Sequence, residues 1–234
     1  MFTPAAFAET DLAWLDRLLA RDPVVTLVTV DGDGLPQASP LPVLYRRDGQ
    51  QVLIEGHWAA ANPQCRHRGP ALVLVHGPHA YLSPGWYPDK HAAARVPTWN
   101  YATAQLRGEL ETFDDPVQLA DLVARLSARH EARVGGDWQM DAGDPRQRRM
   151  LGGIVGFRFR PAAIALKLKF SQNHPPANQQ AVIGALAASD QADARRTGQW
   201  MQLRLSCDGH NRPGNPDDAA IPRPFSPNPS GTPT

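Results

Sequence analysis

The sequence predicts a mainly β (α+β) fold in which a closed or nearly closed antiparallel barrel carries peripheral helices. About seven or eight strand-like runs, rich in apolar and β-branched residues, lie along the chain. Helical patterns interrupt these runs, but few β-α-β alternations occur, which disfavours a parallel sheet. The 23 prolines and 19 glycines among 234 residues favour many turns and short strands over a helical bundle.

The first third of the chain predicts one helix and a three-stranded meander. Residues 10–20 have leucines at helical spacing, with Thr10 as the cap and Asp22-Pro23 as the stop. Asp-Gly turns then separate three strands. These strands are 24–30, 35–46 and 51–55. Prolines cannot donate to a strand ladder, so the second strand is predicted to be an edge or bulged strand. Its prolines are Pro36, Pro40 and Pro42.

The rest of the chain alternates strands and helices. The continuous apolar run 71–76 predicts a strand buried on both faces, kinked afterwards by Gly77-Pro78. A long strand is expected to end near Phe113, and Asp115-Pro116 opens a helix that runs to about Arg133. Further elements are predicted in order. They are a loop with a weak helix over 135–150, strands over 154–160 and 162–170 joined at Pro161, a helix over 178–188 and a short helix around 190–200.

Composition bounds the possible partners and compartment. The formal net charge is +1, so no global basic field exists to hold nucleic acid, and no apolar run has the roughly 20 residues that span a bilayer. We therefore expect no membrane partner. Cys65 and Cys207 lie far apart without a CxxC pattern, which indicates reduced thiols in a cytoplasmic protein and no metal site.

The chain is predicted to hold one folded domain over residues 1–206, followed by a tail. Residues 207–234 are mostly Pro, Gly, Asn, Asp and Ser. Such a composition buries too little apolar surface to offset its conformational entropy, so we expect this tail to be disordered.

The first candidate site is the stretch from Gly56 to Gln64. It follows a strand, and Asn62-Pro63 has the residue types of a helix start. A strand that turns into a helix presents free N–H groups, which suit a phosphate, and His57 lies within reach. The alternative is an ordinary strand-to-helix connection with a structural histidine, because most such connections bind nothing.

Two later stretches also have polar groups suited to a ligand. Trp99 offers a flat ring and Asn100 offers both donors and acceptors, although core packing explains both equally well. Lys169 after the last strand suits a phosphate, and Gln172 and Asn173 suit ring oxygens and nitrogens; the alternative is a solvated strand end. His76 and His79 are not expected to bind metal, since Gly-Pro separates them and no carboxylate is near.

Five stretches in order resemble the PaiB-like family of FMN-binding negative transcriptional regulators. The resemblance covers about residues 1–205. The stretches are the opening Met1-Phe-Thr-Pro4, Gly56-His-Trp-Ala-Ala-Ala-Asn-Pro-Gln64, Gly77-Pro-His-Ala-Tyr-Leu-Ser-Pro84, Val96-Pro-Thr-Trp-Asn-Tyr101 and Lys169-Phe-Ser-Gln-Asn173.

The family is similar to the flavin-binding split barrels of the pyridoxamine-phosphate-oxidase type, and the resemblance implies a homodimer that holds FMN at its interface. It places the phosphate at the Asn62 turn, with His57 and Lys169 adding charge. The ring is expected against the backbone of Leu41 and Pro42 and against Trp99 and Asn100. Gln172 and Asn173 are expected to reach it from the partner subunit. No catalytic residue is assigned.

Two functions follow from this resemblance. The first is an FMN-binding repressor of transcription, although the sequence has no helix-turn-helix pattern. Arg125, Arg129 and Arg133 form a helical stripe suited to DNA phosphates, and a solvated helix face explains that stripe equally well. The alternative is a flavin-dependent oxidoreductase or flavin reductase that uses NAD(P)H, with the aromatic loop from Tyr81 to Tyr87 over the ring. Haem handling is a third reading, supported only by scattered histidines.

Overall fold

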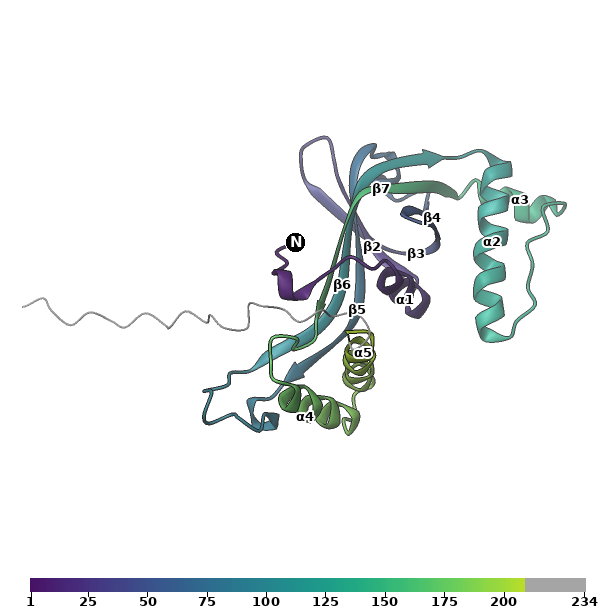
Figure 1. Cartoon of the computed structure of the whole chain (residues 1–234). Coiled ribbons are helices and arrows are strands. Elements are labelled where there is room, and N and C mark those ends of the chain that lie inside the picture. Colours follow the sequence, from purple (N-terminus) through teal and green to yellow (C-terminus); the bar gives the residue numbers. More distant parts are fainter. Residues whose placement is uncertain (209–234) are drawn as a thin grey trace, which may run out of the picture.

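Six strands close into a ring in the computed structural model, which describes residues 1–208 (Figure 1). Neighbours around the ring are β7, β4, β3, β2, β5 and β6, and β6 pairs back onto β7. Every pairing is antiparallel, and the two-residue β1 adds to the outside of β7. The strands are β1 (Ala8–Glu9), β2 (Val24–Val30), β3 (Pro36–Asp48), β4 (Gln51–Ala59), β5 (Gly69–Leu82), β6 (Thr98–Phe113) and β7 (Ile154–Lys169).

The helices gather at two ends of the long strands β6 and β7. Figure 1 shows α2 and α3 at one end and α4 and α5 at the other. The helices are α1 (Ala13–Arg21), α2 (Pro116–Val134), α3 (Pro145–Leu151), α4 (Pro176–Ala187) and α5 (Ala192–Asp208), and the 3-10 turns are η1 (Ala5–Phe7), η2 (Pro63–Arg66) and η3 (Pro84–Trp86). The described helices contain none that is long and apolar enough to cross a bilayer.

The core lies inside the ring and against α1. Leu15, Leu18 and Leu19 of α1 are fully buried, as the leucine spacing predicts, and they join the inward residues of the strands in one cluster. Trp58 and Phe157 pack with ring centroids 4.7 Å apart in that cluster. The predicted class, a mainly β (α+β) antiparallel split barrel with peripheral helices, is confirmed.

Most predicted elements are present, and the edge-strand prediction for the prolines of β3 is confirmed. Residues 36–42 of β3 pair with β2, whereas its pairing with β4 begins only at Val43. The prolines therefore face a side without a strand neighbour in the described fold. The predicted helix start at Asp115-Pro116 is also confirmed, because the Asp115 carboxylate accepts a hydrogen bond from the Gln118 N–H at 2.9 Å.

Several local predictions are wrong. The first helix begins at Ala13, and Asp11, not Thr10, accepts the N–H of Ala13. The run 71–76 is not buried on both faces: its buried side chains alternate with half-buried ones and with the exposed His76, because only one face of β5 meets the core. The last helix continues to Asp208, so residues 207 and 208 are helical. The rest of the predicted tail, residues 209–234, lies outside the described residues.

Pro161 does not divide the last strand in two, because a bulge accommodates it. β7 runs unbroken from Ile154 to Lys169, and its register with β6 shifts between Arg107 and Gly108. Gly108 lies opposite Pro161, and a Cβ at this position would lie 2.1 Å from the carbonyl oxygen of Arg160. Only glycine allows the two backbones to approach this closely.

We expect Gly108→Ala to lower the free energy of unfolding by about 1–3 kcal/mol, because the new methyl group meets rigid backbone atoms and forces the strands apart. Gly32→Ala is the matched control, since a Cβ at Gly32 meets nothing within 4 Å; its effect should stay within about 0.5 kcal/mol. Urea denaturation of both variants measures the difference. Equal stabilities would show that the bulge relaxes without cost.

Candidate functional site

The predicted cofactor residues separate into two clusters within one chain. The β3–β4 cluster contains Leu41, Pro42, His57 and Asn62, and the β6–β7 cluster contains Trp99, Asn100, Lys169, Gln172 and Asn173. His57 pairs with Gly156 at the beginning of β7, whereas Lys169 ends that strand. The 13 steps from Gly156 to Lys169 correspond to roughly 40 Å along the curved strand. The two clusters therefore lie toward opposite ends of β7 (Figure 1).

The turn at Asn62 does not open an α-helix, contrary to the prediction. Only the four-residue 3-10 turn η2 forms, because the chain enters β5 at Gly69. The Asn62 amide oxygen accepts the Gln64 N–H at 3.0 Å, and its amide nitrogen donates to the Ser39 hydroxyl at 3.1 Å. A turn this short has no substantial helix dipole. Asn62 fastens η2 to β3, and the anion site predicted at a helix start does not form in this way.

Gln64, the last residue of the first candidate stretch, is the centre of a buried polar network that the sequence did not predict. Its side chain accepts the indole N–H of Trp58 at 3.1 Å. Its amide nitrogen lies 3.0 Å from Leu27 O, Gln37 O and Thr29 Oγ1, and two of these three contacts use its two N–H groups. Thr29 in turn lies 2.7 Å from Nδ1 of His67. The network joins η2 to β2, β3 and β4, and so it fixes the floor of the β3–β4 cluster.

Leu41 and Pro42 point to opposite faces of β3. Leu41 is buried in the core, whereas the Pro42 side chain is exposed on the outer face of the ring. The carbonyl oxygen of Pro42 would lie 3.1 Å from a Cβ at Gly56, so β3 and β4 approach closely here. Pro42 is therefore the member of this pair that can meet a ligand on the outer face.

His57 lies on the outer strand face that it shares with Glu55. Its Nδ1 is buried and has no hydrogen-bond partner among the described residues. Burial lowers the pKa of His57, so the ring is neutral at pH 7. A neutral imidazole offers a phosphate or a ring nitrogen a hydrogen bond, but not the positive charge that the sequence suggested.

We expect part of the acid sensitivity of folding to come from His57. Its folded pKa lies below the unfolded value of about 6.5, so it favours the folded state above that pH and penalises it as the pH falls. The loss of urea stability between roughly pH 7.5 and 5.5 should be smaller in His57→Leu than in the wild type. His91→Leu, which alters an exposed histidine, should retain the full loss. An unchanged loss in His57→Leu would contradict this assignment.

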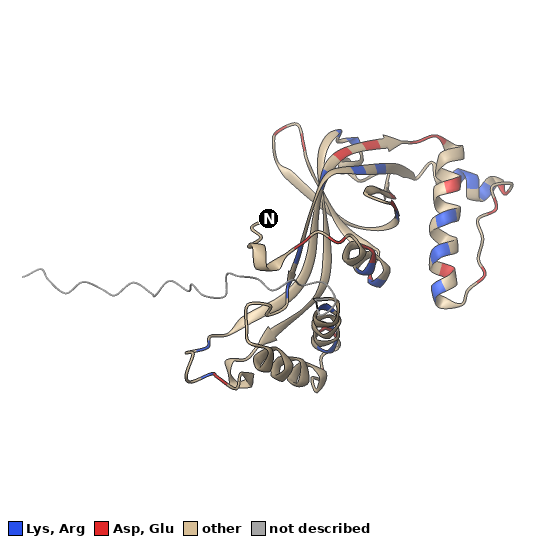
Figure 2. Cartoon of the chain, in the orientation of Figure 1, with Lys and Arg blue, Asp and Glu red and all other residues tan. Residues whose placement is uncertain are grey.

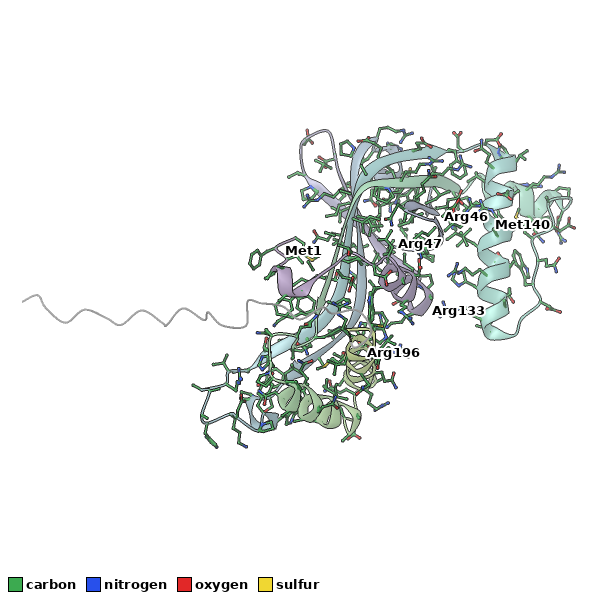
Figure 3. All side chains as sticks on the ribbon, viewed as in Figure 1. Met1, Arg46, Arg47, Arg133, Met140 and Arg196 are labelled. Carbon is green, nitrogen blue, oxygen red and sulfur yellow. The ribbon has the colours of Figure 1, made fainter. Side chains whose placement is uncertain are left out.

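Glu55 is the second feature that the sequence did not reveal. Its side chain is 2% exposed and contacts three arginines. Arg46 and Arg125 approach Glu55 Oε2 at 3.0 and 2.8 Å, and Arg158 approaches Oε1 at 3.3 Å. Arg46 lies on the side of the ring that faces α2 (Figure 3). Burial raises the pKa of Glu55, but the hydrogen bond and charge of Arg125 outweigh it, so the net pKa is lowered.

This cluster attaches α2 to the outer face of the ring. Figure 2 shows acidic residues on the end of β6 next to α2 and basic residues on the neighbouring end of β7. Beside the charges, Leu44 packs against Leu122 and Leu126 of the helix. The attachment places α2 over the strand face that carries Glu55 and His57.

The β6–β7 cluster combines buried and exposed members. Asn100 is 1% exposed, and its amide donates to the Ser171 hydroxyl at 2.9 Å. Trp99 is 51% exposed and meets Tyr81 edge-on, with ring centroids 5.9 Å apart. Lys169 donates to the Trp99 carbonyl at 2.8 Å and to the Thr98 hydroxyl.

The last two predicted residues of this cluster differ in their availability. The Gln172 side chain folds back onto the end of β7, where it accepts the Phe170 N–H at 2.7 Å and donates to the Leu168 carbonyl. It therefore shapes the strand end, which limits what it can offer a ligand. Asn173 is exposed and lines a cavity beside Lys169.

The outer face between the clusters is largely apolar. Val28, Leu72 and Leu74 point away from the core on β2 and β5, where they are half-buried. Val24 and Val30 at the ends of β2 are 45% and 53% exposed. A hollow of about 510 Å³ lies over part of this face, between β2, β5, β6 and β7. Arg107 and Glu109 also line this hollow, and Thr26 lies opposite Leu74, so the face is largely apolar with polar members. A largely apolar exposed face of this kind often marks an interaction site.

Comparisons with known proteins identify a family and relatives that this chain resembles in sequence. A family model described as "Putative FMN-binding domain" matches residues 1–162. The "Protease synthase and sporulation protein PAI 2" of Bacillus subtilis (strain 168) is 28% identical over 209 residues, which cover 88% of this chain and 98% of that protein. The "Uncharacterized protein AN0679" of Emericella nidulans is 26% identical over 223 residues, covering 78% of this chain and 89% of that protein.

One solved structure supports the fold assignment. It is described as a putative 5-nitroimidazole antibiotic resistance protein from Bacteroides thetaiotaomicron VPI-5482. The TM-score is 0.51 at 11% sequence identity, and the match covers 68% of this chain and 85% of that one. At this identity the likeness concerns the fold, and the site must be argued from the residues themselves.

Proposed function

Because the chain belongs to the family described as "Putative FMN-binding domain", its cofactor is FMN, and we propose that two copies of the chain hold the flavin between them. The β3–β4 cluster of one subunit would contribute Pro42, His57 and Asn62. The β6–β7 cluster of the partner would contribute Trp99 and Lys169. The buried, unpartnered Nδ1 of His57 fits this assignment, because a polar group of this kind needs a hydrogen-bond partner.

The separation of the two clusters is the observation that carries the proposal. Within one chain the clusters lie toward opposite ends of β7, so they do not form one site. A two-fold axis on the outer face would place one subunit's β3–β4 cluster near the other's β6–β7 cluster, since an isologous interface pairs each patch with its opposite. The apolar residues Leu72 and Leu74 lie on that face.

The role of the bound flavin is proposed to be regulatory. FMN supplies a redox-active ring, and the residues of this chain bind, orient and shield it. The Bacillus subtilis relative has a name that refers to sporulation, which is in keeping with a regulator. We place the protein in the cytoplasm, where its two free cysteines, Cys65 and Cys207, remain reduced.

Direct DNA binding through the predicted arginine stripe of α2 receives no support. Arg125 contacts Glu55 and Asp121, and Arg133 donates to the carbonyl of Arg21. These contacts commit two of the three arginines to the fold. A gel shift with promoter DNA at low salt tests the repressor role directly, and absence of retardation at micromolar protein would argue that regulation acts through a protein partner.

The alternative is a flavin-dependent oxidoreductase that uses NAD(P)H. The observation in its favour is a cavity of about 420 Å³ beside the β6–β7 cluster, which is large enough for a small substrate. Addition of NADH or NADPH to the FMN-loaded protein under anaerobic conditions distinguishes the two roles. Rapid loss of the oxidised flavin absorbance supports the enzyme, whereas an unchanged spectrum supports the regulator.

Two measurements test the shared-site proposal itself. Fluorescence titration with FMN gives the affinity and the number of flavins per chain, and light scattering gives the mass in solution. We expect one flavin per chain and a dimer. A monomer that binds FMN with full stoichiometry would overturn the proposal.

A further inference from the structure

A cavity of about 420 Å³ lies where β6 begins and β7 ends. The N-terminal turn η1, the loop over residues 93–96 and the segment 171–174 enclose it. Its volume is in the range of pockets that hold small organic molecules. Lys169, Asn100 and Ser171 form its polar wall, and Phe7 and Val96 form part of its apolar wall.

Backbone strain is concentrated around this cavity. Two non-glycine residues have positive φ in the described part of the chain, Ala94 at 45° and Ser171 at 62°, and both line it. Such a conformation costs on the order of 1 kcal/mol or more and is typically retained where a ligand is held. Asn100, itself 1% exposed, holds Ser171 in place through the 2.9 Å hydrogen bond to its hydroxyl.

One polar atom on the cavity lining has unused hydrogen-bonding capacity. The His174 ring stacks on the Tyr87 ring, with centroids 4.9 Å apart and planes 13° apart. His174 Nδ1 is buried and has no hydrogen-bond partner among the described residues. Burial lowers the pKa of His174, so its imidazole is neutral at pH 7 and can offer Nδ1–H as a donor. Leaving such groups unpaired costs free energy that a polar ligand would restore.

The charge around the cavity is positive. Arg95 and Lys169 line it, and its wall contains no carboxylate among the described residues. Arg95 is already paired with Asp89, which also accepts the Asn178 amide at 2.8 Å. Lys169 has only neutral partners, the Thr98 hydroxyl and the Trp99 carbonyl. Burial lowers the pKa of Lys169, which shows that its charge is held at a cost that an anion would reduce.

We propose that this cavity binds the carboxylate of a small organic acid, with Lys169 supplying the charge and the His174 imidazole and the Asn173 amide supplying hydrogen bonds. The acid is the effector or substrate that the flavin protein recognises, and this assignment rests on the proposed function, in which this end of β6 and β7 lies against the partner's flavin. Apolar Phe7 and Val96 favour an acid with a small hydrophobic body.

The matched probes for this site are benzoate and benzamide, which share shape but differ in charge. Calorimetric titration of the FMN-loaded protein should detect benzoate binding at least ten-fold tighter than benzamide binding. Lys169→Met should weaken benzoate at least ten-fold and leave benzamide nearly unchanged, and His174→Phe, which removes the lining imidazole, should weaken both. Lys90→Met is the control, because Lys90 lies outside the cavity lining and donates to the Gly85 carbonyl; it should bind benzoate as the wild type does.

The outcomes separate this inference from the proposed function. Equal binding of the two probes, or an unchanged benzoate affinity in Lys169→Met saturated with FMN, would overturn the carboxylate site without rejecting the flavin site, because excess FMN offsets the loss of the Lys169 contact to the flavin. Exclusion of benzoate by FMN would also overturn it, since the flavin would then fill the cavity. Benzoate binding to a chain that takes up no FMN would preserve the cavity as an acid site and reject the shared flavin site instead.

Discussion

A Leu74→Arg variant is expected to be monomeric and to bind FMN about 100-fold more weakly than the wild type. Leu74 points outward from β5 and lies opposite Thr26 of β2, near the middle of the apolar outer face. A two-fold interface would present this position from both subunits, so one substitution places two guanidinium groups in the contact. Loss of a buried interface anchor costs about 2–4 kcal/mol, and 1.4 kcal/mol corresponds to a ten-fold change in affinity.

The test measures mass by light scattering and FMN affinity by fluorescence on the same samples. Val117→Arg is the matched control, because Val117 is 77% exposed on α2, outside the outer face defined by β2 and β5. It should remain dimeric and retain its flavin. Thermal unfolding checks that both variants are folded. A Leu74→Arg protein that stays dimeric would place the interface elsewhere, and a monomer with unchanged FMN affinity would reject the shared site.

Glu55→Gln is expected to lower the free energy of unfolding by about 3 kcal/mol. The substitution preserves shape but removes the single negative charge that three guanidiniums share. Glu55 is 2% exposed, whereas the side chains of Arg46, Arg125 and Arg158 are 63%, 32% and 28% exposed. Water can therefore partly solvate the arginines. For this reason we expect a smaller decrease in the free energy of unfolding than the roughly 5 kcal/mol that the most deeply buried ion pairs can lose.

The control for Glu55 is Glu111→Gln, which breaks the exposed pair with Arg160 and should cost less than about 1 kcal/mol. The pKa of Glu55 is lowered in the folded state, so its contribution is present above an unfolded pKa of about 4.3 and fades as the pH falls below it. The gap between wild type and Glu55→Gln should therefore narrow in acid. A gap under 1 kcal/mol at pH 7 would show that α2 is held by its apolar contacts alone.

The sequence predicted the strands well, and it predicted the ends of the elements less well. Two local patterns predicted the structure correctly: the β-branched residues of 24–30 form a strand, and Asp115-Pro116 begins a helix. The Asn62-Pro63 signal was equally local but misleading, because the chain must reach β5 within a few residues and leaves room only for η2. The predicted strand break at Pro161 was wrong for a similar reason. Gly108 of β6 lies opposite Pro161 and allows a bulge, so β7 continues through the proline.

The candidate site shows the same division. Residue types identified both clusters, because amides, a lysine and a histidine beside turns have the chemistry of nucleotide recognition. Their position relative to one another was not encoded in spacing. Glu55 looked like an ordinary strand residue until Arg125, 70 positions later, was seen to contact it at 2.8 Å.

Local chemistry in this chain determined its strands, its Asp115 helix cap, its family resemblance and the polar residues that we propose for the flavin site. The closure of the ring, the division of those residues between the two ends of β7, the apolar outer face and the strained cavity were decided by tertiary structure alone. The physical reason is that secondary structure and capping depend on neighbours a few residues apart. Burial, ion pairing and cavity shape depend on residues brought together from distant strands, and no short stretch of sequence specifies them.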